Sequence, residues 1–148
     1  MKQLFILLLL VGFTYSCTSA ADRIPATEIQ EAALAPDLKL DPNNQKWRAD
    51  EATSASIASM QQLMDAFDTG KNVGDIEAFQ ELGNTMNGEL NTLFRQCTMT
   101  GPAHDELHTF LTPIIKDVEI LQGSNIEAST AAQLRLKDRL NVYPSFFE

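Results

Sequence analysis

The residues of this chain best suited to chemistry lie in one short stretch, residues 95–110, with the sequence RQCTMTGPAHDELHTF. Cys97, Met99, His104 and His108 fall within it, and the whole chain holds only two cysteines and two histidines. A thiolate, a thioether and two imidazoles are soft or borderline metal ligands, and the thioether favours copper over zinc, calcium or magnesium. The stretch therefore predicts a copper site with Cys97, Met99, His104 and His108 as its ligands.

The pattern of the rest of the chain indicates what such a site would do. Copper electron-transfer centres use a similar donor set on β-sandwich scaffolds. In this sequence β-branched residues are sparse and no alternation of apolar and polar residues persists, so strands are not expected. Storage, delivery or scavenging of copper(I) is thus favoured over electron transfer.

Other interpretations of the same stretch are weaker or remain open. A Cys–His nucleophile would need an oxyanion hole and a substrate cleft, which a small helical bundle offers poorly, so an enzyme is not predicted. Covalent haem attachment would need a Cys-x-x-Cys-His motif, which is absent from the sequence. Packing is the main competitor, because a lone cysteine often behaves as a small hydrophobic side chain. The sequence leaves metal binding and packing both open.

Four segments show apolar residues at helical spacing, at about residues 45–67, 75–96, 102–121 and 126–143. Long helices with short connections predict an all-α fold, an up-down antiparallel four-helix bundle over residues 45–148. The residues predicted to face its core are Ile57, Met60, Met64, Phe67, Ile76, Phe79, Met86, Leu90, Leu93, Phe94, Leu107, Leu111, Ile114, Ile115, Val118, Leu121, Leu134, Leu140 and Tyr143.

The candidate donors are expected to converge where the second helix ends and the third begins. Cys97 continues the apolar stripe of the second helix, and His104 and His108, four residues apart, share one face of the third. Asp105 and Glu106 suit the first turn of a helix through its dipole, and they are also able to orient the imidazoles as hydrogen-bond acceptors.

The N-terminal residues are predicted to form an export signal followed by a tether. Residues 1–16, MKQLFILLLLVGFTYS, carry Lys2 ahead of an apolar run that is too short to span a bilayer. Ser16 before Cys17 matches a lipoprotein signal, with Cys17 as the lipid attachment site. Cleavage after Ala20 as an ordinary exported protein is the alternative. Residues 17–44 are predicted to be the tether of a membrane-anchored envelope lipoprotein facing the periplasm or the cell surface.

Charge and cysteine usage narrow the classes of partner. The net charge is −9, and removal of residues 1–16 would take away one basic residue, Lys2, and leave −10. Such a chain repels nucleic acid, so the expected contacts are the membrane, through the lipid, and a protein partner in the envelope. If Cys17 is acylated, Cys97 is left as a lone thiol. Such a cysteine is either buried, paired with another molecule or bound to a metal.

The run from Cys97 to His108, together with the C-terminal VYPSFFE, resembles a group of small helical bacterial envelope lipoproteins. The pattern shared with that group is C-T-M-x-G-x-A-H-x-x-L-H followed by a tyrosine- and phenylalanine-rich C-terminus. The resemblance covers residues 90–148 and implies that this turn is a signature of the group, but it implies no particular activity.

Overall fold

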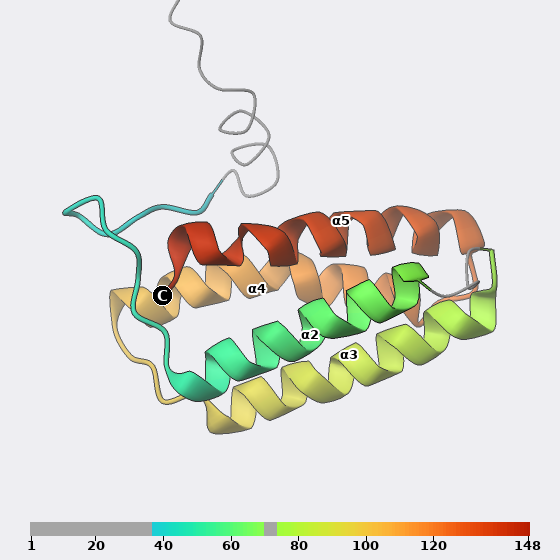
Figure 1. Ribbon diagram of the computed structural model, residues 1–148, viewed down its shortest axis with the longest axis horizontal. Coiled ribbons are helices and arrows are strands. Elements are labelled where there is room, and N and C mark those ends of the chain that lie inside the picture. Colours follow the sequence, from blue (N-terminus) through green and yellow to red (C-terminus); the bar gives the residue numbers. More distant parts are fainter. Residues whose placement is uncertain (1–36, 70–73) are drawn as a thin grey trace, which may run out of the picture.

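The computed structural model describes residues 37–69 and 74–148, and four helices account for most of them (Figure 1). These helices are α2 (Glu51–Thr69), α3 (Ile76–Gln96), α4 (Pro102–Leu121) and α5 (Ile126–Phe146). Each helix packs against the next one along the chain, and α2 also packs against α5, so the four enclose a common core. The predicted all-α four-helix bundle is confirmed. The predicted signal peptide, Cys17 and residues 17–36 of the predicted tether lie outside the described residues.

Side-chain caps explain where the helices begin. Asp75 accepts hydrogen bonds from the Glu77 and Ala78 N–H groups at the start of α3, and Asn125 accepts one from the Ala128 N–H at the start of α5. The sequence placed the start of the first helix near residue 45, but α2 begins at Glu51 because Asp50 caps it, accepting the Thr53 N–H at 2.8 Å. The predicted limits of α4 agree with the structure, since Pro102 occupies its first turn.

Most of the residues predicted to face the core are buried, with two clear exceptions. Phe94 is 46% exposed and Leu134 is 56% exposed, so both predictions were wrong. In α5 the buried residues Ala132, Leu136 and Leu140 follow a spacing of four, and Leu134 lies off that register. Phe94 directly follows the buried Leu93 and lies at the margin of the apolar stripe of α3.

The two ends of the described fold pair with each other. The Trp47 N–H donates to the Phe146 carbonyl at 2.8 Å, and the Glu148 N–H donates to the Trp47 carbonyl at 2.9 Å. The Ala49 N–H donates to the Glu148 carbonyl at 2.9 Å, which completes a short parallel ladder. The Phe147 ring between them stacks on Tyr143 at a centroid distance of 4.9 Å. The aromatic C-terminus therefore fastens the N-terminal segment to the bundle.

Residues 37–44, which the sequence assigned to the tether, also contact the bundle. Leu38 packs against the core, and the Lys39 N–H donates to Glu106 Oε1 at 2.5 Å. The Lys39 carbonyl in turn accepts the indole N–H of Trp47 at 2.6 Å. The described part of this segment is thus held beside the start of α4.

One buried acid joins α4 to α5. The Asp117 side chain is only 4% exposed, and it forms ion pairs with Arg135, at 2.5 Å, and with Arg139. Removing a carboxylate from water is costly unless it is paired and hydrogen-bonded, and two guanidinium groups meet that need. These ion pairs therefore fix the position of α5, which carries the two arginines, relative to α4, which carries the histidines.

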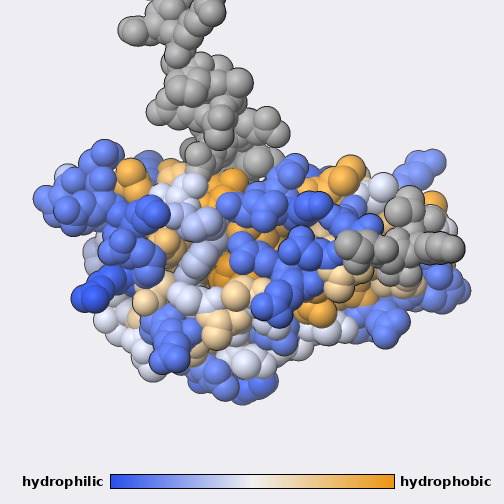
Figure 2. Space-filling model, viewed as in Figure 1, coloured by the Kyte–Doolittle hydropathy of each residue, from blue (hydrophilic) through white to orange (hydrophobic). Residues whose placement is uncertain are grey.

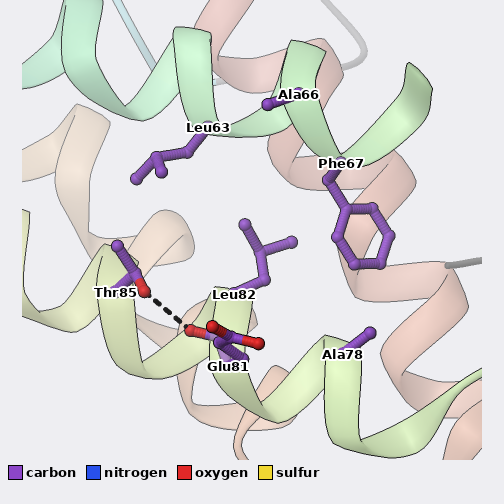
Figure 3. A pocket seen from close by; sticks show the side chains of 7 residues that line it. All are labelled: Leu63, Ala66, Phe67, Ala78, Glu81, Leu82 and Thr85. Carbon is purple, nitrogen blue, oxygen red and sulfur yellow. Dashed lines mark hydrogen bonds between the residues drawn. The ribbon is translucent and has the colours of Figure 1, made fainter. Parts of the chain in front are cut away.

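A shallow groove of about 250 Å³ runs between α2 and α3. Leu63 and Phe67 of α2 and Leu82 of α3 line it, and the small side chains of the neighbouring alanines leave it open (Figure 3). Thr85 at its edge donates its hydroxyl to the Glu81 carbonyl at 2.9 Å. Elsewhere on the face shown in Figure 2, hydrophilic side chains dominate and apolar ones show between them.

Pro144 lies inside α5, where it cannot donate a hydrogen bond to the Leu140 carbonyl. Gln61 of α2 supplies that bond instead, because its Nε2 donates to the Leu140 carbonyl at 2.8 Å. The proline would weaken an isolated helix, but here it leaves a carbonyl group that accepts a hydrogen bond from α2 and so links α2 to α5.

Replacing Gln61 by Ala is expected to lower the free energy of unfolding by about 1–2 kcal/mol, because the Leu140 carbonyl loses its side-chain donor. Urea denaturation followed by far-ultraviolet circular dichroism measures this. Gln62→Ala is the matched control, since Gln62 is exposed on the same helix, and it should change stability by less than about 0.5 kcal/mol. Equal losses in the two variants would contradict the assignment.

Candidate metal centre

The turn between α3 and α4 carries all four predicted ligands, and it lies at the end of the bundle where the chain terminates (Figure 1). Cys97 is the C-cap of α3, and its N–H donates to the Leu93 carbonyl at 2.8 Å. Gly101 is the N-cap of α4, so His104 and His108 lie in the first two turns of that helix.

Asp50, at the start of α2, holds this turn in place. Its Oδ2 accepts the Thr98 N–H at 2.5 Å and the Thr98 hydroxyl at 2.9 Å, while its Oδ1 caps α2. Partial burial raises the pKa of Asp50, but the hydrogen bonds from Thr53 and Thr98 outweigh this, and the pKa falls from 3.8 to about 2. The ionised carboxylate therefore connects the beginning of one helix to the loop between two others.

Gly101 gives the turn its shape. Its φ of 68° and ψ of −154° belong to a region that is open to glycine and strained for other residues. In this conformation its carbonyl accepts the N–H groups of His104, at 2.9 Å, and Asp105, at 3.1 Å. The glycine thus starts α4 without a capping side chain and directs the first turn, which carries His104.

The two histidines lie against each other. Their ring centroids are 4.5 Å apart with an interplanar angle of 78°, an edge-to-face contact between residues four apart on one helix. His104 is half-buried and His108 is exposed. Two imidazole rings therefore lie in contact near the surface at this end of the bundle.

Cys97, His104 and His108 line one pocket of about 430 Å³ between the end of α3 and the start of α4. Phe94, Leu93, Leu107 and Leu111 supply the rest of its wall. Three of the four predicted ligands are thus brought to the same apolar pocket, and the exposed Phe94 lies beside them.

Met99 occupies a different position. Its side chain packs against the hydrophobic core of the bundle, and Met99 is not among the residues that line the pocket. The thioether therefore anchors the loop in the same way as a core residue does.

The two acidic side chains next to the histidines have other roles, one in a hydrogen bond to the N-terminal segment and the other at the positive end of the α4 dipole. Glu106 accepts the Lys39 N–H and so holds the N-terminal segment, while Asp105 lies exposed in the first turn of α4. Within residues 37–69 and 74–148, no three His, Cys, Asp or Glu side chains converge closely enough to form a ready-made metal site. The residues that line the pocket nevertheless include a pair of imidazoles in contact and one thiol.

Sequence reasoning missed two residues that shape this region, Asp50 and Phe94. An N-cap signal at Asp50, ahead of the first apolar stripe, was available from the sequence. Its bonds to Thr98 join residues 48 positions apart and leave no local signal. The sequence instead predicted a core position for Phe94, because an aromatic residue next to an apolar stripe is usually buried.

Comparison of the chain with protein-family models, with curated proteins and with solved structures finds no match.

Replacing Asp50 by Asn keeps an oxygen for the α2 cap but turns an N–H donor toward Thr98, so the turn should loosen. The pKa of Asp50 is depressed on folding, so its contribution is present above pH 3.8 and is lost as the pH falls toward 2. We expect Asp50→Asn to lower the free energy of unfolding by about 1 kcal/mol near neutral pH, after allowance for solvent screening. The difference in this free energy between the variant and wild type should narrow between pH 4 and pH 2.

Denaturant unfolding at a series of pH values tests this. Glu51→Gln serves as the control, because Glu51 is an exposed carboxylate one residue away and its loss should change stability by less than about 0.5 kcal/mol. A difference between wild type and Asp50→Asn that stays constant from pH 5 to pH 2 would contradict the assigned role.

Replacing Gly101 by Ala is expected to destabilise the protein by about 1–3 kcal/mol, because a side chain is strained at its backbone angles. Gly88→Ala is the matched comparison, since Gly88 is an exposed position inside α3 where an added Cβ meets nothing within 4 Å. That change should stabilise by about 0.5–1 kcal/mol through helix propensity. Thermal unfolding of both variants gives the two signs, and a stabilising Gly101→Ala would refute the strained turn.

Proposed function

We propose that this chain is a lipoprotein of the bacterial cell envelope whose bundle binds copper(I), or a similar soft metal ion, for storage, delivery or scavenging. The observation that carries the proposal is the shared pocket of Cys97, His104 and His108. We propose these three as the ligand set because they line the same pocket, whereas Met99 does not line it.

The nature of the donors and of the wall favours copper(I). A thiolate and imidazoles are soft to borderline ligands, whereas magnesium and calcium need an oxygen-rich site. Zinc in structural sites takes a closed set of four donors, whereas three donor residues line this pocket. An apolar wall of leucine and phenylalanine lowers the local polarity and suits an ion of low charge and low coordination number.

Exposure of the donors argues against packing as their whole role. A histidine kept only to fill the core would be buried, but His108 is exposed and His104 is half-buried. By contrast, the other residues of the turn have evident structural work, since Thr98 binds Asp50, Met99 packs on the core and Gly101 forms the α4 cap. His104 and His108 therefore present imidazoles that could bind a metal near the surface of the bundle.

The envelope location is proposed from the sequence of residues 1–44. A lipid on Cys17 would anchor the chain, and the acidic bundle would stand off the membrane on the intervening segment. None of the described helices is long and apolar enough to cross a membrane. The competing function is a non-catalytic structural or protein-interaction bundle in which the same turn is packing.

Titration of the purified, reduced protein with copper(I) in competition with a chromophoric chelator tests the metal function. We expect an affinity tighter than about 1 nM in wild type. Cys97→Ser, His104→Ala and His108→Ala should each weaken it by more than about 100-fold, because each removes a ligand.

Met99→Leu is the matched control, since it keeps the apolar volume of the loop and removes only the thioether sulfur. It should leave the affinity within about threefold of wild type. Failure of the wild-type protein to hold copper(I) against the chelator, with graded stability losses in the three ligand variants, would favour the packing function.

A further inference from the structure

The pocket between the end of α3 and the start of α4 is larger than one metal ion requires. Its volume is about 430 Å³, and pockets that hold small organic ligands begin at about 300 Å³. His108, which is exposed, and Phe94, which is 46% exposed, both line it, so the pocket can be reached from solvent. Besides an ion, the pocket therefore has room for an organic molecule.

The wall of the pocket indicates the chemistry of that molecule. Three buried leucines and one partly exposed aromatic ring line it beside the donor residues, namely Leu93, Leu107, Leu111 and Phe94. An apolar group that enters the pocket leaves water and contacts these side chains, which is favourable. Thioether sulfur in particular makes favourable contacts with aromatic rings, whereas a charged group would lose its hydration against the leucines.

We propose that the pocket binds a neutral thioether of the methionine type together with copper(I), with the thioether sulfur as a further ligand of the ion. This inference rests on the proposed metal function and names the molecule that shares the site. The thioether sulfur donates a lone pair to copper(I) and releases no proton, whereas the Cys97 thiol releases its proton to the solvent when it binds. The methyl group and the carbon chain next to the sulfur lie against Phe94 and the leucines.

Charge favours a thioether over an external thiolate, although both are soft ligands for copper(I). The chain carries a net charge of −9, and the Cys97 thiolate adds another negative charge when it binds. An external thiolate would bring a further anion to the same apolar pocket, whereas a thioether is neutral. The described residues that line the pocket include no methionine, so the thioether comes from another molecule.

Isothermal titration calorimetry of N-acetylmethionine amide into the purified, copper(I)-loaded protein tests this, under anaerobic conditions with a non-thiol reductant. N-acetylnorleucine amide is the matched control, because it has a methylene group in place of the sulfur. We expect the methionine compound to bind at least about tenfold more tightly than the norleucine compound. In reduced protein without copper, the two compounds should bind with affinities within about twofold of each other.

Two variants with matched surface changes locate the binding site. Phe94→Ser should weaken binding of N-acetylmethionine amide to the fully copper-loaded protein by at least about fivefold, because the aromatic part of the wall is lost. Leu134→Ser, at an exposed apolar position on α5, should change this binding by less than about twofold. A Phe94→Ser variant that binds the compound as tightly as wild type would place the thioether outside the pocket and overturn the inference.

Free methionine distinguishes two sources of the thioether, because it carries an ammonium and a carboxylate group that the blocked compound lacks. Equal affinities for free methionine and N-acetylmethionine amide support the inference with a free small molecule as the ligand. Binding of the blocked compound alone supports it with a methionine in the peptide chain of a partner.

The remaining outcomes separate this inference from the metal function. Equal affinities for the methionine and norleucine compounds, in a protein that holds copper(I) against the chelator, overturn the contact between sulfur and copper and leave the metal function standing. A preference for the methionine compound that persists without copper also overturns that contact. Failure to hold copper(I) in the chelator competition overturns the metal function and this inference together.

Discussion

The arrangement of the candidate centre depends on one carboxylate. Asp50 uses one oxygen to cap α2 and the other to hold Thr98, so the start of the first described helix and the turn between the next two move as a unit. Without that link, the turn would be fixed only by Met99 and by the ends of its own helices. The hydrogen bonds from Thr98 that help to keep Asp50 ionised also hold the turn that follows Cys97.

Helical periodicity was enough to predict the four helices, the all-α bundle and most of the core. It succeeded because α2, α3 and α4 each bury one continuous stripe, which sequence spacing reports directly. It failed at Leu134 and Phe94, where an apolar residue lies beside the stripe rather than on it. The ladder between residues 47–49 and 146–148 was not predicted either, because its hydrogen bonds join backbone groups about 100 residues apart in the sequence.

The candidate site was predictable in part, for a related reason. The spacing of His104 and His108 fixes their shared face, and a helix end followed at once by a helix start brings Cys97 near them. Whether a side chain of the intervening turn faces the pocket or the core depends on loop geometry, which spacing does not encode. Met99 packs on the core because Gly101 and the Thr98–Asp50 bonds set the path of the backbone around it.

The attachment of the N-terminal segment to the bundle has a mechanical consequence. Lys39 precedes Trp47 along the chain, so a pull on this segment would load the bond from the Lys39 N–H to Glu106 before it loads the hydrogen bonds between Trp47 and the C-terminal residues. Glu106 lies on α4 between His104 and His108. Tension applied to the N-terminal segment would therefore reach the helix that carries both histidines.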